Sequence, residues 1–213
     1  MAIKDNAIGL VKESLHEMIH VAEYSINYIK EDPKIWGEDA TGGILGWPSS
    51  LILFSVIDCI GSMFKNHKSF KVSIDGKPTK IKTTNQHIYI LNSKYFNLNL
   101  ARIDLKNIHD NVRSPITHNS VLPVGYMLAI GNESVPPFKI GIQDTGRRIY
   151  IIHHKPLLAI TKKAVELFIQ DIESHFEDFE NSPAINDIRK RDVQMKIRSI
   201  VKGVMQIEAN WIT

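Results

Sequence analysis

The chain has 213 residues, of which 43% are hydrophobic and 23% charged, which is the composition of a soluble globular protein and enough length for one large domain. Its formal net charge of +3 neither requires nor excludes an anionic partner, so a nucleic-acid interface would have to come from local clustering of cations. The one cysteine, Cys59, excludes an intrachain disulfide and suits a reducing compartment. The N-terminus lacks a signal-peptide pattern, and the most apolar run, residues 51–64, is too short to span a bilayer. We therefore expect a cytoplasmic protein without membrane contact.

Two long helices are predicted in the first third of the chain. Apolar side chains recur at three- and four-residue steps over residues 3–30, which is typical of an amphipathic helix. Residues 31–46 are glycine-rich but carry no Gly-Lys-Ser/Thr, so they do not indicate a phosphate-binding loop. The second helix is expected from Pro48 to about Asn66, and it is apolar almost all round, so it should be the central buried helix.

Asp58 interrupts the apolar surface of this second helix. It shares one narrow stripe with Ser55 and Ser62. Because a buried carboxylate needs a partner, Asp58 should either bond to backbone groups nearby or orient Arg113 or His118 further along the chain.

The first helix contains His16-Glu17-x-x-His20, which satisfies a zinc-hydrolase pattern. In that chemistry two imidazoles one helical turn apart bind the metal and the glutamate activates water. Few residues precede the pattern, no third ligand follows at the expected spacing, and both histidines lie away from the apolar stripe. We interpret this face as solvated, and a zinc hydrolase that uses His16 and His20 is the least favoured alternative.

Two segments switch from the helical period to the period of two that is typical of strands. Residues 69–92 alternate around Asp75-Gly76, a hairpin turn sequence, and residues 87–91 resemble a third strand. Residues 138–152 form a second predicted hairpin. We expect the two insertions to join in one small antiparallel sheet, because a lone hairpin is marginally stable. Residues 125–130 are apolar, and their periodicity does not distinguish a strand from a helix.

The last part of the chain predicts two more helices. Residues 157–180 have one apolar face and one acidic face, which we interpret as solvated. Residues 184–209 are basic at their start and amphipathic throughout. This accessory helix should pack either on its own domain or on a partner.

Residues 95–113 read as an amphipathic helix with a basic flank. Arg102, Lys106, His109 and Arg113 recur at steps of four, three and four. Pro115 follows, and because proline lacks an N–H and crowds the preceding turn, the helix should kink or stop near Ser114. In an unbroken helix, five residues at about 100° each would put Arg113 and His118 about 140° apart. A kink could bring the two side chains to one site.

An arginine, four intervening residues and a histidine at the end of a helix resemble the motif of the HEPN superfamily. The run from Gly46-Trp47-Pro48 into the second helix and residues 91–96 are also similar to those of bacterial HEPN-like proteins. Where the family usually has Asn, Asp or His after the arginine, this chain has Ser114, and Pro115 is not typical. The resemblance implies a mainly α fold: a single HEPN-like domain over residues 1–213, built as a bundle of four to five helices with the small antiparallel sheet inserted.

The resemblance also implies an activity, that of a metal-independent endoribonuclease without a cofactor, in a toxin–antitoxin or phage-defence system. RNA cleavage needs a base for the 2′-hydroxyl, a proton donor for the leaving oxygen and positive charge on the phosphorane. Arginine is a permanent phosphate clamp and histidine titrates near neutral pH. In HEPN-like enzymes the motif helices of two subunits meet, which would make the chain a homodimer. The implied activity gives RNA and an antitoxin protein as its possible partners. The implied roles are phosphate clamp for Arg113, acid or base for His118, support from Ser114, Asn119 and Asp58, and RNA-backbone binding by Arg102, Lys106 and His109.

A second hypothesis uses the same surface without catalysis. Many basic helix flanks are simply solvated, and one arginine with one histidine does not make an enzyme. A dimeric HEPN-like module would instead use this face to bind a partner, or would serve in a toxin–antitoxin or phage-defence complex.

Overall fold

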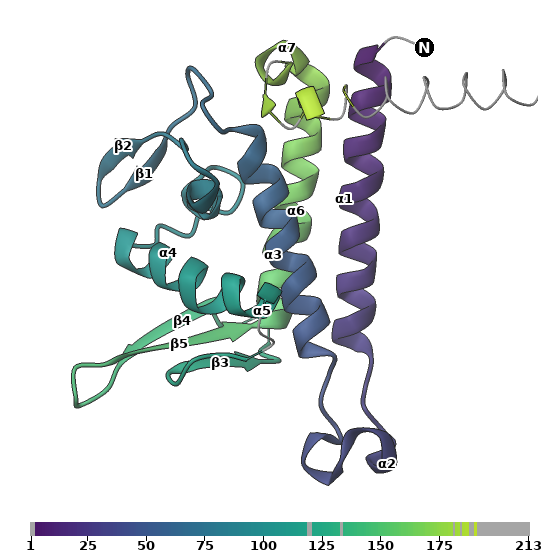
Figure 1. Ribbon diagram of the computed structural model, residues 1–213, viewed down its shortest axis with the longest axis vertical. Helices are drawn as coiled ribbons and strands as arrows, with labels where there is room; N and C mark the ends of the chain where they lie inside the picture. The colour runs from purple at the N-terminus through teal and green to yellow at the C-terminus, as the bar shows by residue number, and fades with distance from the viewer. Residues whose placement is uncertain are drawn as a thin grey trace, which may run out of the picture.

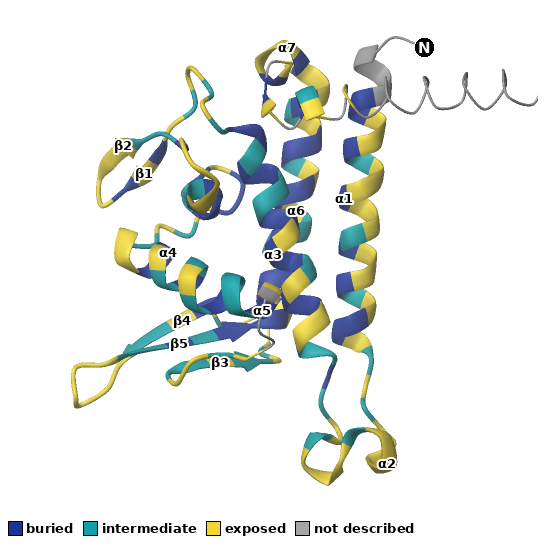
Figure 2. Ribbon diagram, viewed as in Figure 1, coloured by how far each residue is buried: buried dark blue, intermediate teal, exposed yellow. Residues whose placement is uncertain are grey.

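The computed structural model describes residues 3–118, 121–132, 134–180, 182–183, 185–187 and 190, without the side chains of residues 3–6 and 118 (Figure 1). Three long helices run side by side along its longest axis: α1 (Ile3–Asn27), α3 (Gly46–Met63) and α6 (His154–Ser174). They confirm the helices predicted in residues 3–30, 48–66 and 157–180, with ends shifted by a few residues. Figure 2 shows that the buried side of α1 faces α3 and α6, as its apolar stripe requires.

Helix α3 is the centre of the core. It contacts α1 on one side, α6 on another and the 3₁₀ helix η2 (Thr84–Asn92) on a third. Leu53, Val56, Ile57 and Ile60 are fully enclosed. By length and composition alone α3 could cross a membrane, but its buried side chains contact these neighbours as those of a core helix do.

The connection from α1 to α3 projects beyond one end of the bundle (Figure 1). It holds a single turn of helix, α2 (Pro33–Trp36), and the 3₁₀ turn η1 (Glu38–Ala40). The side chain of Asp32 accepts a hydrogen bond from the backbone N–H of Lys34 at 2.9 Å and so caps α2.

In the described part of the chain, five strands form two separate sheets. The first is the hairpin β1 (Val72–Ile74) and β2 (Lys77–Thr79), whose turn residues Asp75 and Gly76 both have positive φ, at 51° and 74°. That backbone conformation is the one a two-residue hairpin turn requires, and it confirms the hairpin predicted from Asp-Gly.

The second sheet has the order β3-β5-β4. The antiparallel hairpin of β4 (Phe138–Ile142) and β5 (Arg148–His153) confirms the prediction for residues 138–152. The prediction of one joint, purely antiparallel sheet is wrong, because β3 (Tyr126–Ala129) fills the open edge of β5 and pairs with it in parallel. Tyr126 and Tyr150 stack across this pair with ring centroids 5.0 Å apart.

The strand predicted at residues 87–91 is also wrong, since these residues lie in η2. All five of them are buried, whereas a strand on a one-sided sheet exposes alternate side chains. A capping box starts the element: Thr83 bonds to the backbone of Gln86, and the side chain of Gln86 accepts from the backbone N–H of Thr83.

The helix predicted over residues 95–113 begins later and ends later. Asn97 and Asn99 both have φ of 52°, so the chain is irregular until α4 (Arg102–Ile108). It then continues through a π-helical turn, η3 (His109–Arg113), into α5 (Ser114–His118). The predicted stop near Ser114 is wrong, because Ser114 has φ −65° and ψ −49° and its N–H bonds to the carbonyl oxygen of His109. A kink at this point stays a prediction. The π turn just before Pro115 changes the hydrogen-bond pattern without breaking the helix.

Helices α6 and α7 meet at the end of the bundle opposite α2 (Figure 1). A break at His175 separates α6 from the single turn α7 (Phe176–Phe179), so the helix predicted over residues 157–180 is interrupted. Phe64, Phe168 and Phe179 pack edge to face there. Most of the predicted accessory helix, residues 184–209, lies outside the described residues.

Candidate functional site

Arg113 and Asp58, which are far apart in the sequence, form an ion pair between the π turn and the central helix. Arg113 Nε–H donates to Asp58 Oδ2 at 2.7 Å, and Nη2 contacts the same oxygen. The side chains are 27% and 16% exposed, so the pair is largely withdrawn from water but still reaches the surface. Of the two partners considered for Asp58, the structure shows Arg113. Within the described part of the chain, Nη1 of Arg113 has no hydrogen-bond partner.

A buried histidine lies beside this ion pair. A Cβ built on Gly61 would lie 2.4 Å from the carbonyl oxygen of His87, so α3 and η2 cross at this point. Asp58 is one helical turn before Gly61 and therefore on the same face of α3. His87 is 7% exposed, and its Nε2 has no hydrogen-bond partner among the described residues. The sequence predicts a strand at residues 87–91 and does not single out His87 as a site residue, because no local pattern distinguishes it.

Charged groups on the neighbouring elements act on His87. Burial lowers the pKa of His87 below its ordinary value. The Asp58 carboxylate opposes that change, while the positive charges of Lys65, Arg113 and His109 add to it. We call Asp58, His87, His109 and Arg113 the junction cluster, because they join α3, η2 and the π turn.

The predicted basic stripe is matched by carboxylates along its length. Arg102 lies near Asp75 of the β1–β2 turn, with Nε 3.7 Å from Oδ2. Lys106 pairs with Asp110 one turn later, and His109 Nδ1 lies 2.8 Å from the same carboxyl group. The hydrogen bonds from Lys106 and then His109 hold the pKa of Asp110 below its usual value. The stripe is therefore less positive than the sequence of cations suggests.

The remaining residues of the motif are described only in part. Ser114 begins α5 and is half-buried, and Thr117 Oγ1 donates to the carbonyl oxygen of Arg113 at 2.8 Å. The backbone of His118 ends α5. The side chain of His118 and all of Asn119 lie outside the described residues, so the structure brings Arg113 together with Asp58 but gives no position for the imidazole.

His16, Glu17 and His20 are exposed on α1. Among the residues that the structure describes, no three histidine, cysteine or acidic side chains converge as metal ligands. The zinc pattern thus lies on a solvated helix face, as interpreted from its position on the helical wheel.

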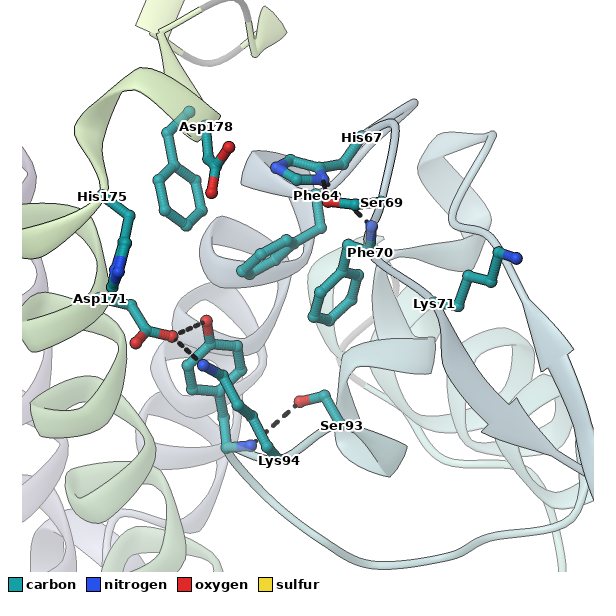
Figure 3. Close-up of a pocket in the computed structure, with 12 residues that line it drawn as sticks. Phe64, His67, Ser69, Phe70, Lys71, Ser93, Lys94, Asp171, His175 and Asp178 are labelled. Carbon is teal, nitrogen blue, oxygen red and sulfur yellow. Dashed lines mark hydrogen bonds and ion pairs between the residues drawn. The ribbon is translucent and has the colours of Figure 1, made fainter.

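A second candidate site, which the sequence did not suggest, is a cavity of about 470 Å³ between the end of α3, the segment after η2 and the α6–α7 junction (Figure 3). Tyr95 donates its hydroxyl hydrogen to Asp171 at 2.6 Å, and Lys94 pairs with the same carboxylate. Burial and this hydrogen bond raise the pKa of Tyr95 far above its ordinary value. Burial would also raise the pKa of Asp171, but the hydrogen bonds from Lys94 and Tyr95 outweigh it and leave that pKa lowered.

The wall of this cavity is aromatic. Phe64 and Phe70 stack with centroids 3.9 Å apart, and His67 Nδ1 accepts the backbone N–H of Phe70 at 3.2 Å, so the neutral ring carries its proton on Nε2. Tyr95, Lys94 and Asp171 each have a polar partner inside the chain. This is the pattern of a structural cluster that stabilises the end of the bundle.

Comparison of the chain with models of known protein families, with curated proteins and with solved structures found no match in any of the three.

Proposed function

We propose that the chain is a metal-independent endoribonuclease of the HEPN type, with Arg113 as phosphate clamp and His118 as acid or base. The observation that carries the proposal is the position of Arg113, which Asp58 holds at the end of a π turn, five residues before His118. Turns of this kind occur frequently at functional sites.

Asp58 orients the guanidinium for binding an anion. A guanidinium has five N–H donors in a rigid fork, and Asp58 engages Nε and Nη2, which leaves the hydrogens of Nη1 for a phosphate oxygen. Because the carboxylate belongs to the central helix, the arginine loses little further side-chain freedom when it binds, which favours catalysis by a prepositioned charge.

One arginine and one histidine supply only part of the chemistry that RNA cleavage needs. We therefore propose a homodimer in which two copies of the motif helix face one another, so that one copy provides the base and the other the acid. Arg102, Lys106 and His109 would border this cleft. RNA would be the substrate, and a protein antitoxin would be the natural regulator if the enzyme limits growth.

The matched carboxylates favour a second candidate, a dimeric HEPN-like binding module without catalysis. Asp75 and Asp110 each neutralise a cation of the predicted RNA-binding stripe, and Asp58 neutralises the predicted phosphate clamp, Arg113. A surface of paired charges suits a protein partner, since such rim charges provide specificity more than affinity.

RNA cleavage in the presence of EDTA separates the two candidates. The nuclease proposal predicts cleavage by the wild-type protein, loss of at least about 100-fold in His118→Ala and in Arg113→Ala, and retained cleavage in His20→Ala, which changes an exposed histidine on α1. A folded dimer that leaves RNA intact and does not slow growth on expression would reject the nuclease and favour the binding module.

A further inference from the structure

His87 is a buried titratable group that the proposed chemistry does not use. Its side chain is enclosed, with 7% of the residue exposed, and its Nε2 lacks a partner among the described residues. Leaving a buried polar atom unpaired destabilises the fold, so an unpaired imidazole nitrogen in a core is expected to have a reason.

The position of His87 suggests that reason. Its backbone lies against Gly61, one turn after Asp58 on the same face of α3, and Asp58 holds Arg113. Asp58 is the carboxylate whose charge favours a charged ring at His87, and it is already bonded to the arginine. Two cations at this place would compete for one carboxylate.

We propose that His87 is a pH-sensitive regulator of the Arg113–Asp58 ion pair: when its imidazole is protonated, it competes with Arg113 for Asp58 and releases the arginine from α3. The step moves one proton from solvent to His87 and exchanges one ion pair for another. Its consequence for RNA cleavage depends on the proposed function, but the exchange itself does not.

The groups that act on His87 from the surrounding elements fix the direction of the switch. Asp58 on α3 attracts the imidazolium, whereas Lys65 after α3 and His109 and Arg113 on the π turn repel it. Burial is the largest of these effects and lowers the pKa of His87 below 6.5, so the ring is neutral at neutral pH and Arg113 stays bound to Asp58. As the pH falls from 6.5 towards this lowered pKa, the ring becomes charged and weakens that bond.

Solution NMR of the full chain without RNA tests the switch. The His87 ring and the Arg113 Nε–H signal are followed from pH 7.5 downwards, and hydrogen exchange of Nε–H reports its bond to Asp58. At the pH where half of the His87 rings are charged, we expect Nε–H to exchange severalfold faster in the wild type than in His87→Gln, whose side chain stays neutral. At pH 7.5 the two proteins should exchange equally.

His109→Gln is the matched control, because it removes the other histidine of the junction cluster. It should leave the pH response of Arg113 in place. The inference fails if Arg113 responds to pH identically in His87→Gln and wild type, or if His87 stays neutral until the protein unfolds. If the His87→Gln chain does not fold, the wild-type titration still decides, since the midpoints of His87 and Arg113 must coincide. Because no RNA is present, this result stands apart from the cleavage test.

Discussion

The ion pair of Arg113 and Asp58 connects the π turn to the central helix. Replacing either residue leaves the other without a counter-charge. The pair is mostly withdrawn from water, with Arg113 27% and Asp58 16% exposed, so losing one partner costs more than the loss of a surface ion pair. We expect Asp58→Ala to lower the free energy of unfolding by about 1–3 kcal/mol.

The double variant Asp58→Ala/Arg113→Ala checks that account by urea unfolding. Because it removes both charges, it should be less destabilised than the sum of the two single variants, by about 1–2 kcal/mol. Strict additivity would mean that the ion pair contributes nothing and that Arg113 is held by packing alone.

Two buried histidines make the fold sensitive to acid. Burial lowers the pKa of His87 and of His154, and the Oγ of Ser50 lies 2.8 Å from Nε2 of His154. Since both rings titrate at lower pH in the folded chain than in the unfolded chain, the unfolded chain binds more protons below pH 6.5. The free energy of unfolding is therefore highest above pH 6.5 and falls as the pH drops towards the folded pKa values, by about 1.4 kcal/mol for each unit of displacement.

Urea unfolding at pH 7.5 and 5.5 measures this loss. His87→Gln should lose less stability between the two values than the wild type, and exposed His20→Gln should lose as much as the wild type. Asp171 affects stability in a separate, more acidic pH range. Because its pKa is lowered, its contribution to the free energy of unfolding is lost only as the pH falls below 3.8. An unchanged free energy of unfolding between pH 7.5 and 5.5 would contradict the burial of neutral histidines.

At the level of elements, the crossing of α3 and η2 depends on the absence of one side chain. A Cβ at position 61 would lie 2.4 Å from the carbonyl oxygen of His87, whereas a Cβ on Gly9 of α1 would meet nothing within 4 Å. Gly61→Ala should therefore force the two elements apart and cost about 1–3 kcal/mol, despite the higher helix propensity of alanine.

Gly9→Ala is the matched control and should stabilise the protein by about 0.5–1 kcal/mol, as alanine does in an open helix position. The melting temperatures of the two variants should shift in opposite directions. A stabilised Gly61→Ala chain would show that α3 and η2 do not approach this closely.

Sequence periodicity was a good guide to the elements that are set locally. The stripe of α1, the apolar circumference of α3 and the Asp75-Gly76 turn each determine their element from neighbouring residues alone. The prediction of a strand at residues 87–91 is wrong, because a histidine followed by four apolar or aromatic residues fits both a strand and a helix that is buried all round. Pro115 does not stop the helix, since a π turn precedes it and the backbone stays helical through α5.

At the scale of the whole molecule, the features that the sequence could not predict are the ones that join distant segments. The parallel pairing of β3 with β5, the cavity lined by Asp171 and the contact of Gly61 with His87 all depend on tertiary packing. The ion pair of Asp58 with Arg113 is one of the alternatives that the sequence predicts, because a carboxylate in an apolar helix needs a partner, but the sequence does not decide between that pair and bonds to nearby backbone groups.

The central claim of the account is that the guanidinium of Arg113 receives the phosphate of an RNA strand. The most direct measurement adds a non-cleavable 2′-O-methyl RNA to the ¹⁵N-labelled protein and follows the Nε–H signal of Arg113. The account predicts a saturable shift of this signal that weakens as salt is raised, while binding itself is reduced in Arg113→Ala. An Arg113 signal that stays in place at saturating RNA, or RNA binding that is unchanged in Arg113→Ala, would contradict it.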